Sequence, residues 1–447
     1  MIDLVRDTAL SILNEINENG AYSNIAFNRH VEKHDFSNAE KAFITDLVYG
    51  TVKWKLTIDW IIGQYSNIKL KKISPWIMNI LRLGVYQILF LEKVPDSAAC
   101  NESVKLSKRY GHQGSSRFVN GLLRNVIRDK NNIKYPEDNL VEYLSLRYSH
   151  PEWMVKRWVD HFGPQFTEEL LESNNSVPEF CIRVNTLKTT REELKKLLEQ
   201  EDIQAEDGQF ADEALIIKNP ASITKLDLYK KGYFQIQDES SMLVSKVLGP
   251  KPGQLVVDVC SAPGGKSMHI AQLMQNKGKV ISRDIHEHKI KLINEGAKRL
   301  GVDIIEASVF DARMTDVNLI AKADCVLVDA PCSGFGIIRR KPDIKWSRKP
   351  DDKNEIAKLQ YDILNNAAHY VKPGGKLVYS TCTIEKDENN DIVERFLKNN
   401  KDFYLGNIKE DIPSKISDSV EEEGFIQLYP NVHGTDGFFI SKMIKRG

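Results

Sequence analysis

Residues 255–266 read LVVDVCSAPGGK, and this stretch decides the fold of the chain. Four of its first five residues are apolar, a run typical of a buried strand, and only Asp258 interrupts it. The turn that follows consists of small residues, and Lys266 begins a predicted helix that continues to Met274. A strand, a glycine turn and a helix in this order indicate an α/β domain. We therefore expect a ligand at the turn, where the first N–H groups of the helix are free.

The same alternation continues to the end of the chain. Strands are predicted at 279–282, 304–305, 325–328, 376–379 and 438–441, and helices at 287–300, 352–371 and 389–399. Strands that alternate with helices imply a doubly wound parallel sheet of the Rossmann-like class. We place this domain at residues 231–447 and expect its ligands at the carboxyl ends of the strands.

The first part of the chain has a different pattern. Apolar stripes at 4–16, 38–52, 76–91, 98–109 and 115–128 have helical spacing, and glycine or proline breaks separate them. We predict an all-α bundle of about six helices in residues 1–133. Residues 134–230 read as further helices at 141–175, followed by a small α/β module with strands at 180–184 and 214–217. The chain is thus expected to be multidomain.

Composition excludes several classes of protein. The 447 residues are 41% hydrophobic and 28% charged, which is ordinary for a globular protein. No apolar run is long enough for a membrane helix, and Asp3 and Asp7 stand where a signal peptide would be apolar. The six cysteines include no C-x-x-C pair, so neither a disulfide scaffold nor a metal site is expected. We expect a cytoplasmic protein that does not enter a membrane.

Charge is unevenly distributed along a chain whose net charge is zero. Residues 1–133 carry 18 Lys and Arg against 13 Asp and Glu, and residues 101–133 carry 7 against 2. A basic face suits a polyanion such as a nucleic acid, whereas a solvated helical surface is the alternative interpretation.

The glycine turn fits one of three ligand classes. A P-loop would need glycine where Cys260 stands, and the G-x-G-x-x-G dinucleotide fingerprint is absent. S-adenosylmethionine (SAM), which needs no phosphate cradle, remains. Asp284 ends the next strand, where an acid can bind ribose hydroxyls, or alternatively cap a helix. Asp311 follows the third strand, suited to the adenine edge of the cofactor, or alternatively to a turn.

Two cysteine motifs follow the fourth and fifth strands. Asp329-Ala330-Pro331-Cys332 comes first, and Ser380-Thr381-Cys382 comes second. Neighbouring parallel strands would bring both motifs to one cleft, and two thiols with a carboxylate there suggest covalent catalysis. A thiolate that adds to C6 of cytosine activates C5 toward a sulfonium methyl group, and a second group must then assist release.

These motifs together resemble the RNA cytosine-5 methyltransferase family (NOL/NOP/Sun type). The helical block, with its stretch Arg117–Arg124, resembles a NusB-like RNA-binding domain. The resemblance implies an all-α NusB-like N-terminal bundle, a small α/β linker module and a Rossmann-like methyltransferase domain. It also implies SAM-dependent methylation of C5 of a cytosine in 16S rRNA.

The resemblance also implies roles for individual residues. Cys382 would be the nucleophile, Cys332 would assist breakdown of the adduct, and Asp329 would hold the N3/N4 edge of the base. Asp329 could accept a hydrogen bond from N4 or, if protonated, donate one to N3. The implied SAM contacts are Cys260, Ser261, Ala262, Pro263, Gly264, Gly265, Lys266, Asp284, Asp311 and Asp329.

The sequence also suggests which partners the protein binds and which other functions are possible. The basic stretch 339–349, which follows the Cys332 motif, is interpreted as an RNA contact, with a solvated loop as the alternative. Its Trp346 would either stack on a base or pack on the core. We expect a monomer without an obligate protein partner and without a metal. The alternatives are a non-catalytic RNA-binding assembly factor, or a cytosine-5 methyltransferase that acts on tRNA or DNA. In the DNA case Cys332 would be the nucleophile and Cys382 would be dispensable.

Overall fold

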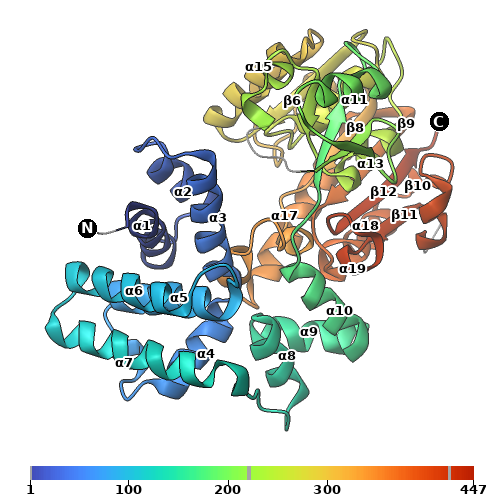
Figure 1. Ribbon diagram of the computed structural model, residues 1–447. Helices are drawn as coiled ribbons and strands as arrows, with labels where there is room; N and C mark the ends of the chain where they lie inside the picture. The colour runs from blue at the N-terminus through green and yellow to red at the C-terminus, as the bar shows by residue number, and fades with distance from the viewer. Residues whose placement is uncertain (1–2, 219–222, 421–423) are drawn as a thin grey trace. The chain divides into compact units, whose positions relative to one another are not determined.

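The computed structural model describes residues 3–218, 223–420 and 424–447, which form two compact units (Figure 1). The helical unit contains Met1–Ser176 and Ile338–Pro350, and the sheet unit contains Val177–Ile337 and Asp351–Gly447. The chain therefore leaves the sheet unit at residue 338 and returns to it at residue 351. The middle segment expected from the sequence, 134–230, is shared between the two units.

The helical unit is all-α, as the sequence predicts. Its helices are α1 (Leu4–Asn19), α2 (Ser23–Val31), α3 (Asn38–Lys53), α4 (Lys55–Tyr65), α5 (Pro75–Phe90), α6 (Asp96–Tyr110), α7 (Gln113–Asp129), α8 (Leu140–Tyr148), α9 (Glu152–Phe162), α10 (Pro164–Asn175) and the short α16 (Ile344–Ser347). Of these, α2, α4 and α16 were not predicted. Only Trp54 separates α3 from α4, and no side chain caps the start of α2 or α4.

Local chemistry explains where the first helix begins and ends. The Asp3 side chain accepts hydrogen bonds from the first backbone N–H groups of α1, and Gly20 ends the helix in the left-handed conformation. Leu10, Ile12 and Leu13 lie on the buried face and join the core of the helical unit. The predicted stripe at 4–16 is thus the core-facing side of α1.

A small antiparallel sheet lies at the start of the sheet unit. Its strands are β1 (Phe180–Val184), β2 (Ala205–Asp207), β3 (Ala214–Ile217) and β4 (Phe234–Ile236), in the order β2-β3-β1-β4, with helices α11 (Arg191–Glu199) and α12 (Asp227–Lys230). The predicted strands at 180–184 and 214–217 are confirmed. Leu194 and Leu198 of α11 pack with Ile182 and Leu215 in a core of its own.

The large sheet has the strand order β10-β12-β9-β8-β5-β6-β7, and β11 pairs with β12. Its strands are β5 (Leu255–Asp258), β6 (Lys279–Asp284), β7 (Ile305–Val309), β8 (Ala323–Asp329), β9 (Val371–Thr381), β10 (Phe403–Leu405), β11 (Phe425–Leu428) and β12 (Phe438–Lys445). Strands β5 to β9 are parallel, as expected. The last strand differs from the expectation of a parallel sheet, because β12 runs antiparallel to β9 and the sheet is mixed.

Helices pack on both faces of this sheet (Figure 1). They are α13 (Glu239–Leu248), α14 (Gly265–Leu273), α15 (Glu287–Leu300), α17 (Asp352–Ala367) and α18 (Asn390–Asn399), and the short α19 (Pro430–His433) precedes β12. The residues of α13, α14 and α15 form one hydrophobic cluster with the strands, and those of α17 and α18 form another. This arrangement leaves the carboxyl ends of β5, β8 and β9 for the polar residues that follow them.

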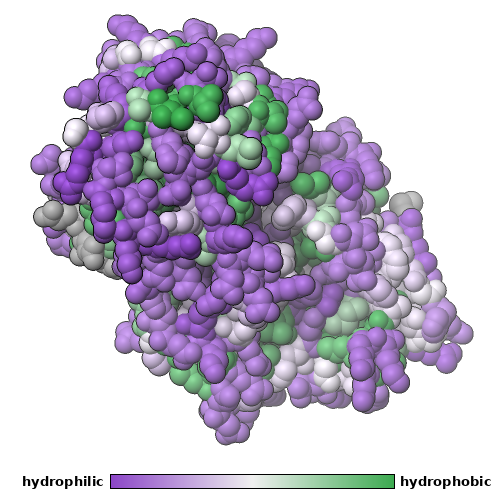
Figure 2. Space-filling model, turned by 180° about the vertical axis from the view of Figure 1, so that it is seen from behind, coloured by the Kyte–Doolittle hydropathy of each residue, from purple (hydrophilic) through white to green (hydrophobic). Residues whose placement is uncertain are grey.

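The view in Figure 2 shows a face on which hydrophilic residues predominate and hydrophobic residues form patches between them. Among the described residues, no helix combines the length and the apolar character that crossing a membrane would require.

Candidate active site

The two cysteine motifs meet at the ends of two neighbouring parallel strands. β8 and β9 pair in a register that places Asp329 opposite Ser380, and each cysteine follows its strand by one to three residues. The Sγ atoms of Cys332 and Cys382 are 3.3 Å apart. Backbone hydrogen bonds join the two turns, from Ala330 N to Ser380 O and from Gly336 N to Cys382 O. The predicted meeting of the motifs is therefore present in the structure.

Both thiols are half-buried, so part of each sulfur environment is protein and part is open to an incoming substrate. The hydrogen bond with Cys382 and burial hold the pKa of Cys332 well above its usual value. A thiol with a raised pKa keeps its proton at neutral pH, which suits a group that exchanges protons rather than one that attacks.

Asp329 is held by a donor on each of its carboxylate oxygens. Lys266 Nζ lies 2.7 Å from Oδ2, and Ser380 Oγ donates to Oδ1 at 2.9 Å. Lys266 is the second residue of α14, and its ammonium group also lies 4.9 Å from the ring centre of Phe438. The structure thus brings a predicted cofactor contact, Lys266, to a predicted catalytic residue.

Backbone hydrogen bonds help to shape the glycine turn. Ser261 N donates to Arg283 O at 2.8 Å, and Gly264 N donates to Ser261 O at 2.7 Å. Gly264 has φ +100°, a backbone conformation that side chains other than glycine rarely adopt. A Cβ atom on Gly265 would meet only Gln237, at 3.9 Å, which leaves room beside the helix N-terminus.

Beneath this turn lies Asp258, a functional candidate. It belongs to the first predicted strand but was not among the predicted site residues. Ser267 Oγ donates to its Oδ2 at 2.6 Å, and Ser282 Oγ donates to Ser267 Oγ at 2.9 Å. Oδ1 is buried, and no described residue donates a well-formed hydrogen bond to it. Burial raises the pKa of Asp258 to about 7, and the neighbouring Asp329 adds to the rise. A buried Asp at the end of the first strand is the signal that could have found it.

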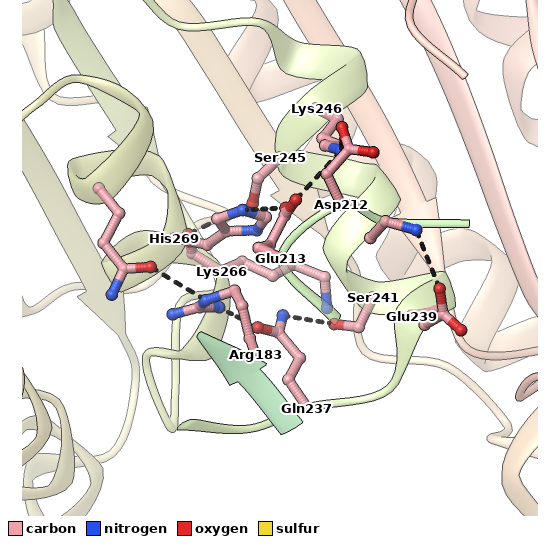
Figure 3. A network of polar contacts seen from close by, with 12 residues as sticks. Arg183, Asp212, Glu213, Gln237, Glu239, Ser241, Ser245, Lys246, Lys266 and His269 are labelled. Atoms are coloured by element: carbon pink, nitrogen blue, oxygen red, sulfur yellow. Dashed lines mark hydrogen bonds and ion pairs between the residues drawn. The ribbon is translucent and has the colours of Figure 1, made fainter. Parts of the chain in front are cut away.

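A buried arginine of the small sheet supports the same turn (Figure 3). Arg183 of β1 donates through Nη1 to Gly265 O at 2.9 Å and to the side chain of Gln237, and through Nε to Gln272 at 3.1 Å. Burial lowers its pKa to about 9, so the guanidinium still carries its charge at neutral pH. Figure 3 also shows His269 of α14 against Glu213, and these two side chains lie 2.8 Å apart.

The two outer aspartates are engaged by their own neighbours. Asp284 ends β6, and its Oδ1 accepts from His286 N at 3.0 Å, while Lys289 lies 3.5 Å away. Asp311 forms a two-pronged ion pair with Arg313 and accepts from the Arg313 backbone N–H. The Arg313 hydrogen bond lowers the pKa of Asp311. The contacts of Asp311 are those of its alternative interpretation, a turn. Asp284 does not cap a helix, because the N-cap of α15 is His286.

The basic stretch 339–349 is where the structure departs most from expectation. Lys345 is fully buried in the helical unit, and its Nζ donates to Lys53 O at 2.9 Å and to Ser149 O at 2.8 Å. Trp346 Nε1 donates to Val52 O at 2.7 Å. Lys345 and Trp346 therefore hold the C-terminal ends of α3 and α8. The interpretation of Lys345 as an RNA contact is wrong, and Trp346 packs against the core of the helical unit, which was its alternative interpretation.

Within the described ranges, no group of three or more His, Cys, Asp or Glu side chains is arranged to hold a metal ion.

Comparisons with known proteins match three parts of the chain. Residues 245–444 match the family described as 16S rRNA methyltransferase RsmB/F, and residues 4–128 match the NusB family. Residues 150–224 match a ferredoxin-like domain of the RsmF/B-like methyltransferases.

Full-length relatives agree with these matches. The probable ribosomal RNA small subunit methyltransferase B of Bacillus subtilis (strain 168) is 42% identical over 99% of each chain. The corresponding protein of Synechocystis sp. is 34% identical over 98% of this chain and 99% of its own. Among solved structures, PH0851 is 30% identical, covers 98% of each chain and has a TM-score of 0.83.

Proposed function

This chain belongs to the RsmB/F family of 16S rRNA methyltransferases, and we propose that it methylates C5 of a cytosine in 16S rRNA through a covalent bond from Cys382 to C6. The observation that carries the proposal is the 3.3 Å separation of the Cys332 and Cys382 sulfur atoms beside Asp329. One base in this position is within reach of both thiols and of a carboxylate.

The residues around the glycine turn fit SAM. The turn 260–265 leaves room beside the N-terminus of α14, and the buried Asp258 ends the strand that leads into it. We propose that Cys260 to Lys266 with Asp284, Asp311 and Asp329 line this site, and we add Asp258. Bound SAM supplies the methyl group as an electrophile, while the protein supplies position and electrostatic field.

The proposed first step is addition of the Cys382 thiolate to C6 of the cytosine. The new S–C6 bond moves the electron pair of the C5=C6 double bond to C5, which then takes the methyl group. In this proposal Asp329 accepts a hydrogen bond from the N4 amino group, because both of its carboxylate oxygens already act as acceptors, from Lys266 and from Ser380.

The proposed second step releases the product. A water molecule takes the proton on C5, the electron pair of the C5–H bond forms the C5=C6 double bond, and the S–C6 bond breaks with its electron pair going to Cys382 as the thiolate. Cys332 assists this step, since its sulfur lies within hydrogen-bond distance of the leaving sulfur.

We further propose a division of labour along the chain. Residues 1–133 would bind RNA, residues 134–230 would connect, and residues 231–447 would carry out the chemistry. The exposed part of the stretch 339–349, such as Lys341, would contact phosphates. The proposal includes a single copy of the chain acting in the cytoplasm without a metal.

A covalent trap tests the proposed function. Cys332→Ala is mixed with SAM and, separately, with 16S rRNA, 23S rRNA, tRNA and DNA, and denaturing gels are read for a protein–nucleic acid band. We expect a band with 16S rRNA only, and none from the matched double variant Cys332→Ala/Cys382→Ala.

Other results of the trap would support the alternative functions. A band from Cys382→Ala alone would give the nucleophile role to Cys332, as in the DNA-type alternative. A band with tRNA and none with 16S rRNA would change the substrate. Failure of wild-type protein to bind SAM would favour a non-catalytic RNA-binding factor.

A further inference from the structure

Two consecutive buried residues, Glu388 and Asn389, each hold one of the two cysteine turns. They lie between Cys382 and α18, and their exposed fractions are 1% and 0%. Neither is used by the proposed chemistry. Their side chains therefore need another explanation, because a buried carboxylate without a task would destabilise the fold.

Glu388 holds the turn that carries Cys332. Its Oε2 accepts a hydrogen bond from Ser333 N at 2.9 Å and another from Gln360 Nε2 at 2.9 Å. The same Gln360 amide donates to Pro331 O at 3.0 Å. The backbone on both sides of Cys332 is thus tied to one carboxylate and one amide.

Asn389 holds the turn that carries Cys382 in a matching way. Its Oδ1 accepts from Thr381 Oγ1 at 2.5 Å, and its Nδ2 donates to Thr383 O at 3.1 Å. Gln427 Oε1 accepts from the same Nδ2 at 2.7 Å, which fixes the orientation of the amide. The residues on both sides of Cys382 are thus tied to one side chain.

The two supports cannot shift independently, because they are joined by a peptide bond. Tyr379 OH, from β9 itself, donates to Glu388 O at 2.7 Å and anchors the pair to the sheet. Above them, Ser333 and Thr383 join their hydroxyl oxygens at 2.7 Å. A closed ring of contacts that passes through Glu388 and Asn389 therefore links the two turns that carry the sulfur atoms.

We propose that Glu388 and Asn389 are positioning residues that hold the two thiols so that both can act on one base. Glu388 affects the release of the methylated RNA through Cys332. Asn389 affects the formation of the covalent adduct, which we call capture, through Cys382. This inference rests on the proposed covalent function. The negative charge of Glu388 also supports the proposed role of Cys332 in release. It adds to the factors that raise the pKa of Cys332 and so helps this thiol to keep its proton.

The roles separate in an experiment that follows adduct formation and adduct release with 16S rRNA and SAM. Glu388→Ala, with Cys332 intact, should release RNA more slowly by about tenfold or more, so that the covalent band accumulates as in Cys332→Ala. Asn389→Ala in the Cys332→Ala background should form the band more slowly by a similar factor. SAM affinity should stay within about twofold in both variants, because neither side chain contacts the glycine turn.

Conservative variants distinguish positioning from folding. Glu388→Gln keeps an oxygen that can accept from Ser333 and should release RNA within about threefold of wild type, whereas Glu388→Asp keeps the charge but is one methylene shorter and should behave as Glu388→Ala. Wild-type release by Glu388→Asp, or wild-type capture by Asn389→Ala, would overturn the inference. If Cys332→Ala alone captures no RNA, the proposed function fails, and this inference fails with it.

Discussion

Lys266 Nζ lies 2.7 Å from Asp329 Oδ2, although the first residue follows β5 and the second ends β8. The glycine turn and the cysteine motif are thereby linked through one ion pair, with a side-chain exposure of 12% for Lys266 and 28% for Asp329. Because β5 and β8 are neighbours in the sheet, this contact joins the proposed cofactor site to the proposed base site.

If the ion pair orients Asp329, removing either partner should slow methyl transfer. We expect Lys266→Met and Asp329→Asn each to lower the single-turnover rate by about 100-fold. The double variant should be little worse than Asp329→Asn, because both changes remove the same interaction. Rates of tritiated methyl transfer to 16S rRNA measure this, with Lys251→Met, an exposed lysine, as the control. Fully additive effects would show that the two residues act separately.

Arg183 should control the affinity for SAM rather than the chemistry. Its Nη1 holds the carbonyl of Gly265 at the start of α14 (Figure 3). Arg183→Met leaves that carbonyl and Gln272 without their donor, and we expect the SAM dissociation constant to rise about tenfold. Calorimetric titration measures it, and Arg128→Met, whose side chain is 70% exposed, serves as the control. An unchanged affinity would mean that the turn holds its shape without Arg183.

Asp258 should make the stability of the sheet unit depend on pH. Burial raises its pKa to about 7 in the folded protein, whereas an unfolded Asp titrates near 4. The stabilisation from its proton is therefore complete below about pH 4 and is lost as the pH rises through about 7. Asp258→Asn lacks this dependence, so its free energy of unfolding relative to wild type should improve by about 2 kcal/mol between pH 5 and pH 8.

Urea titrations at several pH values measure this difference. Asp212→Asn, whose side chain is fully exposed, is the matched control and should differ from wild type by the same amount at each pH. A pH-independent difference for Asp258→Asn would show that Asp258 is ionised in the folded protein throughout.

Contacts that follow from strand order could be predicted from the sequence. The meeting of Cys332 with Cys382 is such a contact, since both follow neighbouring parallel strands. The antiparallel direction of β12 could not be predicted, because an apolar run does not reveal its direction. The roles of Glu388 and Asn389 were also out of reach, since they depend on which way side chains point after a turn.

Lys345 is a clearer case of a residue whose role the sequence could not predict. A run of basic residues with a tryptophan has the composition of an RNA contact, and nothing local distinguishes Lys345 from Lys341. Only the packing of residues 338–350 in the helical unit places Lys345 at the ends of α3 and α8. Burial of a charge depends on distant partners, which composition and spacing do not report.

Lys341 and Lys345 should affect different properties of the protein, RNA binding and stability respectively. Lys341 is exposed, and if it contacts a phosphate, Lys341→Met should reduce the slope of log affinity for 16S rRNA against log salt by about 1. Lys345 is fully buried, so Lys345→Met should leave that slope unchanged. It should instead lower the free energy of unfolding of the helical unit by about 2 kcal/mol, because the carbonyls of Lys53 and Ser149 lose their donor. Filter binding at several salt concentrations and thermal unfolding of both variants measure the two quantities. A reduced slope with unchanged stability for Lys345→Met would mean that Lys345 reaches RNA after all, and an unchanged slope for Lys341→Met would remove this residue from the RNA interface.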